Sequence, residues 1–131
     1  MKTVRLILGD QLNQNHSWFN SIDNDVVYLM AEMRQETDYV KHHIQKVVAF
    51  FMAMRSFKKD LSNKGHHFIY LELNDLNNPQ DLEKIISQCI RETNAEKFEY
   101  QLPDEYRLDQ QLLQICESLE IKSSSVDTEH F

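Results

Sequence analysis

The carboxylates of Asp10, Glu32 and Glu36 are the side chains whose types and positions could build a ligand site. Asp10 stands in the stretch LILGDQLN (6–13), where an apolar run ends at Gly9, and Asp10 and Gln11 follow before any helix signal. In an α/β protein, the loop that leaves the first strand is a usual place for a ligand. The question is what a loop carrying an acid and an amide would hold.

The residues around this loop converge on one rim of the predicted sheet. The first strand leads into Asp10, the second ends at Glu32 and Met33, and a long helix begins there with Glu36 and Tyr39. Carboxylates and amides accept hydrogen bonds from N–H and O–H groups, so this cleft favours a neutral, hydroxyl-rich or heteroaromatic molecule over a phosphate. Alternatively, Asp10 caps the next turn and Glu36 caps the helix. The residues alone leave both interpretations open.

Several other kinds of site are excluded by simple counts and spacings. Gly9 and Gly65 are the only glycines, so the loops GxGxxG and GxxxxGK[ST], which bind dinucleotides and phosphates, cannot be present. The histidine pairs 42–43 and 66–67 are adjacent, and their side chains point apart on a helix or a strand, so neither pair can share a metal ion. Cys89 and Cys116 are isolated, which predicts two buried thiols in a reducing compartment.

Length and composition predict one soluble domain. A chain of 131 residues with 41% apolar and 27% charged residues is ordinary for a globular protein. The net charge of −7 repels the phosphate backbone, so we expect no direct binding to nucleic acid. No apolar run approaches the roughly 20 residues that cross a bilayer, and MKTVRLIL runs into polar residues without a cleavage site. We therefore expect a cytoplasmic protein without membrane contact.

The order of apolar runs predicts an α/β protein with a parallel sheet. Strands are expected at residues 3–8, 25–31, 67–73, 97–102 and 121–126, because runs of this kind suit strands buried on both faces. Helices are expected between them: one from Thr37 or Asp38 to Gly65, one over 78–94 with Pro79 in its first turn, and one over 104–120. A short helical turn is expected around 17–21. Strands alternating with helices predict a three-layer α/β/α sandwich.

The long helix has more apolar residues than one face needs. One stripe is expected to pack on the sheet: Val40, Ile44, Val47, Phe51 and Met54. A neighbouring stripe either widens the core, meets a partner, or walls a pocket beside the strand ends: Tyr39, His43, Phe50 and Phe57.

Four stretches together resemble one protein family. They are LILGDQL (6–12), ETDYVKHHIQK (36–46), AMRSF (53–57) and LPDEYRL (102–108), and they span essentially the whole chain. The chain resembles the N-terminal domain of the prokaryotic photolyase-related proteins, the iron–sulfur branch of the cryptochrome/photolyase family. The resemblance implies a Rossmann-like sandwich over residues 1–131, with strand order 3-2-1-4-5.

In that family, this domain holds an antenna chromophore, which for this branch is 6,7-dimethyl-8-ribityllumazine. The resemblance implies that the opening loop is a chromophore-binding loop. The cofactor-binding residues that it implies are Gly9, Asp10, Gln11, Glu32, Met33, Glu36, Tyr39 and Phe50. Phe50 stands where a smaller aliphatic residue is expected, which would narrow the pocket.

The resemblance also implies a partner that this chain lacks. In the family, a helical C-terminal domain carries FAD and a four-iron cluster and repairs DNA or senses blue light. We expect this chain to be no enzyme by itself, and to expose an apolar patch around Trp18 and Phe19 that promotes self-association. The alternatives are a receiver-like or a nucleotide-binding regulatory domain. A receiver needs an acidic pair after its first strand and a lysine after its fifth, whereas here a single acid follows the first predicted strand and no lysine follows the fifth. The scarcity of glycine argues against a nucleotide-binding domain.

Overall fold

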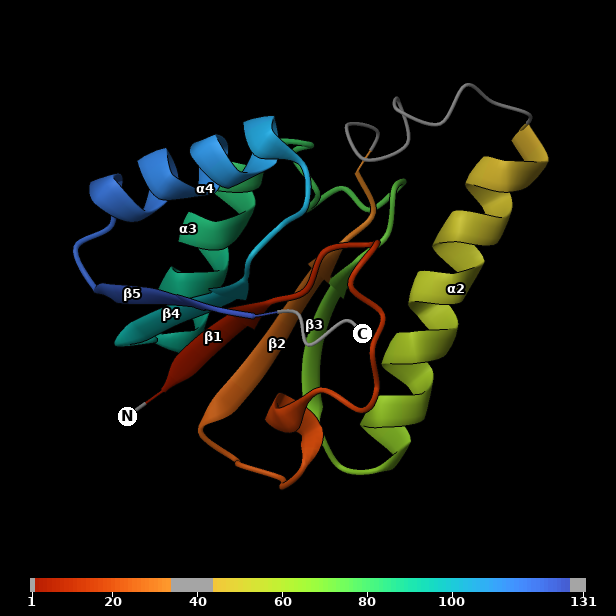
Figure 1. The fold of residues 1–131 in the computed structure, drawn as a ribbon, viewed down its shortest axis with the longest axis horizontal. Helices are drawn as coiled ribbons and strands as arrows, with labels where there is room; N and C mark the ends of the chain where they lie inside the picture. The colour runs from red at the N-terminus through yellow and green to blue at the C-terminus, as the bar shows by residue number, and fades with distance from the viewer. Residues whose placement is uncertain (1, 34–43, 128–131) are drawn as a thin grey trace.

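The five strands form one parallel sheet in the computed structural model, which describes residues 2–33 and 44–127. The order is β3-β2-β1-β4-β5 (Figure 1), which confirms the prediction. Each strand is up to two residues shorter at either end than its apolar run. The strands are β1 (Thr3–Leu6), β2 (Val26–Ala31), β3 (His67–Leu71), β4 (Lys97–Gln101) and β5 (Lys122–Val126).

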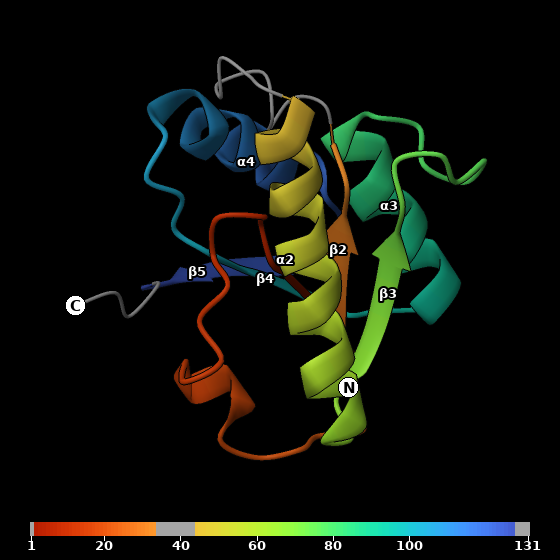
Figure 2. The ribbon, with the colours of Figure 1, turned by 90° about the vertical axis from the view of Figure 1, so that its right-hand side faces the viewer.

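Helices cover the two faces of the sheet unequally. The helices α3 (Leu82–Thr93) and α4 (Tyr106–Ser118) lie on one face, and α2 (Ile44–Asn63) lies on the other (Figure 1). On the α2 face, the segment between β1 and β2 runs beside α2 and contains a short 3₁₀ helix, η1 (Ser17–Phe19) (Figure 2). The three-layer Rossmann-like architecture is therefore confirmed, with an irregular segment covering part of one layer.

Alternation along the strands separates two apolar clusters. On the α3/α4 face, Leu29, Phe98 and Leu112 are buried in a first cluster. On the α2 face, a second cluster buries strand residues such as Ile7 and Met30 against α2. The buried side chains of α2 in this cluster are Phe51, Met54, Phe57 and Leu61. Phe51 and Met54 confirm the stripe predicted to pack on the sheet, whereas Val40 lies outside the described residues. Burying such side chains is the main stabilising contribution to a fold of this size.

The end of α2 follows the expected glycine signal. Gly65 adopts a φ of +106°, a left-handed conformation that side chains with a Cβ rarely adopt. The N–H of His66 donates to the carbonyl of Leu61 at 3.1 Å, which closes a Schellman-type cap. The start expected at Thr37 or Asp38 lies outside the described residues.

The prediction for Pro79 is wrong. The helix α3 begins at Leu82 with Asp81 as its N-cap, so Pro79 precedes the helix and does not lie in its first turn. The physical reason is the preceding loop, in which Gln80 has a φ of +56°. The side-chain Nε2 of Gln80 and the Nδ2 of Asn78 both donate to the carbonyl of Glu32, at 2.9 and 3.0 Å. These bonds hold residues 78–80 against β2 and delay the start of the helix.

The expectation that Trp18 contributes to an exposed patch is also wrong. Trp18 is buried under the guanidinium of Arg5, which lies 5.0 Å from its ring centre. Arg5 in turn donates to Glu99 at 3.0 Å and to the Tyr28 hydroxyl at 3.1 Å. Phe19 is half-buried. Large apolar side chains are exposed elsewhere, including Val48, Met52, Leu76 and Tyr106.

One histidine joins the segment after β1 to the residue that follows the edge strand β5. His16 is buried, and its Nδ1 accepts from the Trp18 N–H at 3.1 Å, which caps η1. The other ring nitrogen, Nε2, therefore carries the proton and donates to the carbonyl of Asp127 at 2.7 Å. The segment is thereby tied to the residue that follows β5.

Candidate functional site

The strand order places the topological switch point of the sheet between the ends of β1 and β4. The chain builds β1, β2 and β3 toward one edge and then returns to place β4 on the other side of β1. At such a switch point the two connecting loops leave in opposite directions, which opens a ligand crevice beyond the carboxyl ends of the strands. The loop after β1, with Gly9, Asp10 and Gln11, lies at this point, as expected.

Gln11 shapes this loop from within. Its side chain is buried, its Oε1 accepts from the N–H of Leu8 at 3.1 Å, and its Nε2 donates to the carbonyl of Gln101 at 3.1 Å. Both ends of the amide are thus bonded to the protein, and the loop after β1 is fastened to the end of β4. Asp10, next to Gln11, is exposed.

Gly9 is required by the ring of Phe50. A Cβ atom built on Gly9 would come within 2.7 Å of Phe50 Cε1, closer still to Phe50 Cζ, and within 3.1 Å of Met54 Sδ. The half-buried Phe50 ring therefore rests directly on the backbone of the loop.

Glu32 is fully buried and bonded on every side. Its carboxylate accepts from Arg55 Nε and Nη2 at 2.6 and 2.9 Å, and from the Tyr70 hydroxyl at 2.6 Å. The N–H of Leu73 completes the set at 3.0 Å. Four donors fill the lone pairs of a carboxylate, so Glu32 joins β2, β3 and α2 instead of presenting an acceptor to a ligand.

The same contacts explain the ionisation of this cluster. Burial alone raises the pKa of the Glu32 carboxyl, but the bonds from Arg55, Tyr70 and the Leu73 N–H outweigh it and hold the pKa below its ordinary value. The pKa of Tyr70 is raised by burial and by the neighbouring carboxylate, and the pKa of Arg55 is raised by its bond to Glu32. Glu32 is therefore an anion held by a cation at neutral pH.

Of the other expected site residues, the structure describes Met33 and Phe50, and it places them on opposite faces of the sheet. Met33 is buried in the cluster on the α3/α4 face, while Phe50 packs against the cluster on the α2 face, so the two belong to opposite sides of the sheet. Glu36 and Tyr39 lie outside the described residues.

Gln101, the last residue of β4, is a polar residue that sequence reasoning missed. Its side chain is 1% exposed, and neither its Oε1 nor its Nε2 has a hydrogen-bond partner in the described part of the protein. A buried amide without partners is rare and calls for an explanation. A sequence signal existed, because Gln101 ends an apolar strand at the edge where Asp10 was already placed.

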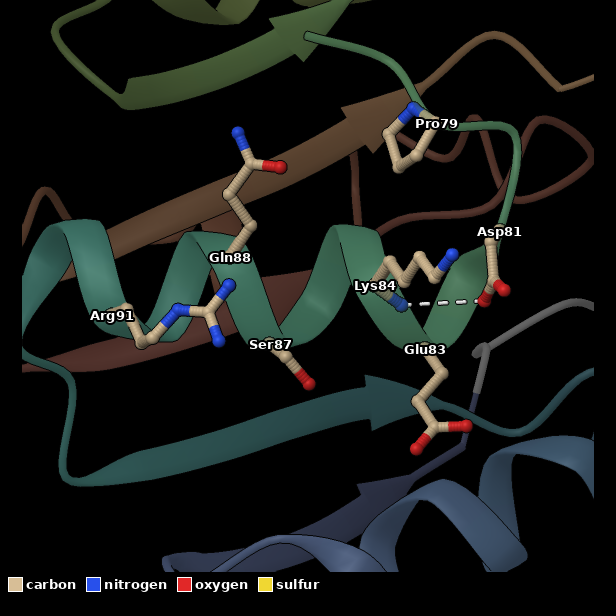
Figure 3. Close-up of a pocket in the computed structure, with 7 residues that line it drawn as sticks. All are labelled: Pro79, Asp81, Glu83, Lys84, Ser87, Gln88 and Arg91. Atoms are coloured by element: carbon tan, nitrogen blue, oxygen red, sulfur yellow. Dashed lines mark hydrogen bonds between the residues drawn. The ribbon is translucent and has the colours of Figure 1, made fainter.

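Surface hollows on the outer side of α3 give no comparable site. One of about 560 Å³ is lined by Asp81, Lys84, Arg91 and neighbouring residues of α3, and an adjoining one of about 290 Å³ shares Ser87 and Arg91. Figure 3 shows the lining side chains spread along the helix and pointing in different directions. Their charges are mixed, and the Lys84 N–H is engaged by the Asp81 cap at 3.3 Å.

Metal-binding clusters and membrane-spanning helices are both absent from the described ranges. Within residues 2–33 and 44–127, no three histidine, cysteine, aspartate or glutamate side chains gather in a way that could hold a metal ion. In the same ranges, no helix is long and apolar enough to cross a membrane. Burial raises the pKa of the Cys89 thiol to about 12, as expected for an inert buried cysteine.

Comparison with known proteins decides the family. The model of the deoxyribodipyrimidine photo-lyase-related proteins matches residues 5–131. This chain belongs to that family. A curated (6-4) photolyase of Agrobacterium fabrum is 29% identical over 110 residues, which are 82% of this chain and 22% of the relative. The photolyase-related chain thus spans about a fifth of the length of the curated relative that it matches.

We predict that Gly9→Ala lowers the free energy of unfolding by about 1–3 kcal/mol, because the new Cβ forces the Phe50 ring to move. In a Phe50→Val background, Gly9→Ala should lower the free energy of unfolding by less than about 0.5 kcal/mol. Urea unfolding of the natural chain, the two single variants and the double variant measures this coupling. Gly65→Ala is the control: its strain comes from the left-handed backbone and from Ile22, not from Phe50, so it should lower the free energy of unfolding equally in both backgrounds. An undiminished cost of Gly9→Ala in the Phe50→Val background would contradict the contact.

We predict that Glu32→Gln lowers the free energy of unfolding at pH 7 by about 2–3 kcal/mol, because bonds to a charged group are lost. Since its hydrogen bonds hold the folded pKa of Glu32 below the ordinary value, its stabilising contribution is fully present above the ordinary pKa and is lost as the pH falls through the folded pKa. The variant should lack this part of the acid dependence.

The matched control is Glu72→Gln. Glu72 pairs with the same Arg55, at 3.6 Å, but its side chain is 58% exposed. Glu72→Gln should lower the free energy of unfolding by at most about 1 kcal/mol. Urea unfolding between pH 3 and pH 7 compares the two variants, and equal losses of stability would show that the buried Glu32 carboxylate contributes no more to stability than an exposed one.

Proposed function

We propose that this chain is the antenna-chromophore-binding domain of a photolyase- or cryptochrome-like flavoprotein, with the chromophore held beside the loop after β1. The observation that carries the proposal is the family match over residues 5–131, which includes this loop at the switch point of the sheet. The ligand that we favour is 6,7-dimethyl-8-ribityllumazine. It is a neutral bicyclic ring with a hydroxyl-rich chain, which suits the exposed acceptor that Asp10 offers.

The charge and shape of the crevice favour such a ligand over a phosphate. The net charge of −7 and the exposed carboxylate of Asp10 would repel a phosphate, and Gly9 offers no glycine-rich cradle because Phe50 covers it. The Asp10 carboxylate can accept from ribityl hydroxyls, whereas the Phe50 ring over Gly9 narrows the space for the bicycle. Glu36 and Tyr39 would complete the contacts.

An antenna absorbs light and passes the excitation energy to the flavin, so this domain would act together with a second one. The curated relative is about five times longer than the matched part. We propose that a helical C-terminal domain, with FAD and a four-iron cluster, is the partner of this chain, and that the parent is a photolyase-like lyase or a blue-light receptor of the cytoplasm. Contact with DNA would fall to that domain, because this one is acidic.

The proposal predicts that the 131-residue chain binds the lumazine and that Phe50→Val tightens binding about tenfold, because the ring no longer competes for the space over Gly9. Fluorescence polarisation of the lumazine, titrated with protein, measures both affinities. Met52→Val is the matched control: this side chain of the same helix is 63% exposed, and its truncation should change nothing. Absence of binding to both the natural chain and Phe50→Val at high micromolar concentration would refute the proposal.

A second prediction concerns catalysis. The chain alone should show no light-dependent repair of a pyrimidine lesion, because repair needs a bound flavin, which we assign to the C-terminal domain. The assay is illumination of the purified chain with lesion-containing DNA and added FAD, followed by analysis of the lesion. Measurable repair would overturn the division of roles between the two domains.

A further inference from the structure

Gln101 offers the crevice a rigidly held donor and acceptor that the fold does not use. Its backbone carbonyl accepts from Gln11 Nε2 at 3.1 Å, and the residue is paired with Val126 of β5, so its main chain is fixed on both sides. Its side-chain amide is buried, and neither Oε1 nor Nε2 is bonded to the described protein.

The side chain points to the face that carries the loop after β1. Alternation places Tyr100 in the cluster of the α3/α4 face, and Gln101 therefore faces the other way. On that face Ile7 is buried, and Leu12, Phe50 and Val126 pack around the same cluster. The buried amide of Gln101 thus faces the side of the sheet on which these apolar side chains and the Phe50 ring lie.

Another polar side chain of this strand and face is treated differently. Glu99, two residues earlier, accepts from Arg5 at 3.0 Å and from the Ser124 hydroxyl at 3.5 Å. The fold therefore supplies partners to a half-buried polar side chain in this layer, but among the described residues it supplies none to the buried amide at the end of the strand. A leucine at position 101 would fill a similar volume without leaving a buried amide unsatisfied. The position of the amide next to a ligand crevice suggests that its partners come from the ligand.

We propose that Gln101 is a specificity-determining residue that reads the imide edge of the heterocyclic ring, an inference that rests on the proposed chromophore site. A side-chain amide presents one donor and one acceptor side by side. The imide of a pyrimidinedione ring presents the complementary pair: its C=O accepts from Nε2, and its N–H donates to Oε1. A carboxylate at this position could not donate, and a phosphate could not satisfy Oε1.

The test combines a protein variant with a ligand variant. Gln101→Leu removes donor and acceptor, and methylation of the imide nitrogen of the lumazine removes the matching N–H. We expect Gln101→Leu to weaken lumazine binding ten- to a hundredfold, roughly the effect of losing such bonds in a buried site. Methylation should weaken binding to the natural chain about as much, and should have little further effect on Gln101→Leu.

Two controls separate recognition from structure. Urea unfolding should show that Gln101→Leu is at least as stable as the natural chain, since a buried amide without partners is replaced by an apolar side chain. Gln88→Leu, on the outer side of α3, should leave affinity and the methylation effect unchanged. The same four affinities, those of the natural and the methylated lumazine for proteins with and without Gln101→Leu, are also measured in the Phe50→Val background, in which the Phe50 ring no longer covers Gly9. The comparison of the two lumazines on the natural chain does not depend on the folding of any variant.

The outcomes distinguish this inference from the proposed function. If the natural chain binds the lumazine but Gln101→Leu binds equally well, or if methylation costs both proteins the same, the recognition role of Gln101 is overturned while the chromophore site stands. If neither the natural chain nor Phe50→Val binds the lumazine, both are overturned. If methylation strongly weakens lumazine binding to the natural chain but not to Gln101→Leu, both the chromophore site and the recognition role of Gln101 are supported.

Discussion

The burial of a single carboxylate, that of Glu32, organises one end of this domain. An ion without water must be paired and fully hydrogen-bonded, or it destabilises the fold. Here the donors come from a helix, a neighbouring strand and a loop, through Arg55, Tyr70 and Leu73. The backbone carbonyl of the same residue holds the loop before α3. One residue thereby joins α2 to the sheet and holds the loop that precedes α3.

The two faces of the sheet are closed by different means, and this difference creates the candidate site. On one face, two helices pack on the strands with apolar side chains. On the other, one helix shares the cover with an irregular segment (Figure 2). An irregular segment has backbone groups and polar side chains that need individual partners. Arg5, Glu99 and His16 have such partners within the protein, and Gln101 marks the place where the described part of the protein provides none.

The sequence predicts the strands and their architecture because buried parallel strands need continuous apolar runs, and Gly65 marks a helix end because of its backbone freedom. It could not reveal the role of Glu32, because Arg55 and Tyr70 lie 23 and 38 residues away along the chain. The separation of Met33 from Phe50 was predictable in principle, since Met33 follows Glu32 in the strand direction and alternation places it on the opposite face. The place of Gln101 at the end of a predicted strand could be read from the sequence, but its lack of hydrogen-bond partners in the described part of the protein could be seen only from the packing around it.

The hydrogen bond from His16 to the Asp127 carbonyl has a mechanical consequence. Asp127 is where the polypeptide leaves the sheet, and His16 belongs to the segment that begins at the candidate site. A pull on the polypeptide beyond Asp127 would load this hydrogen bond before it reached the ladder between β4 and β5. Such a load would therefore reach the segment that follows the candidate site through the imidazole of His16.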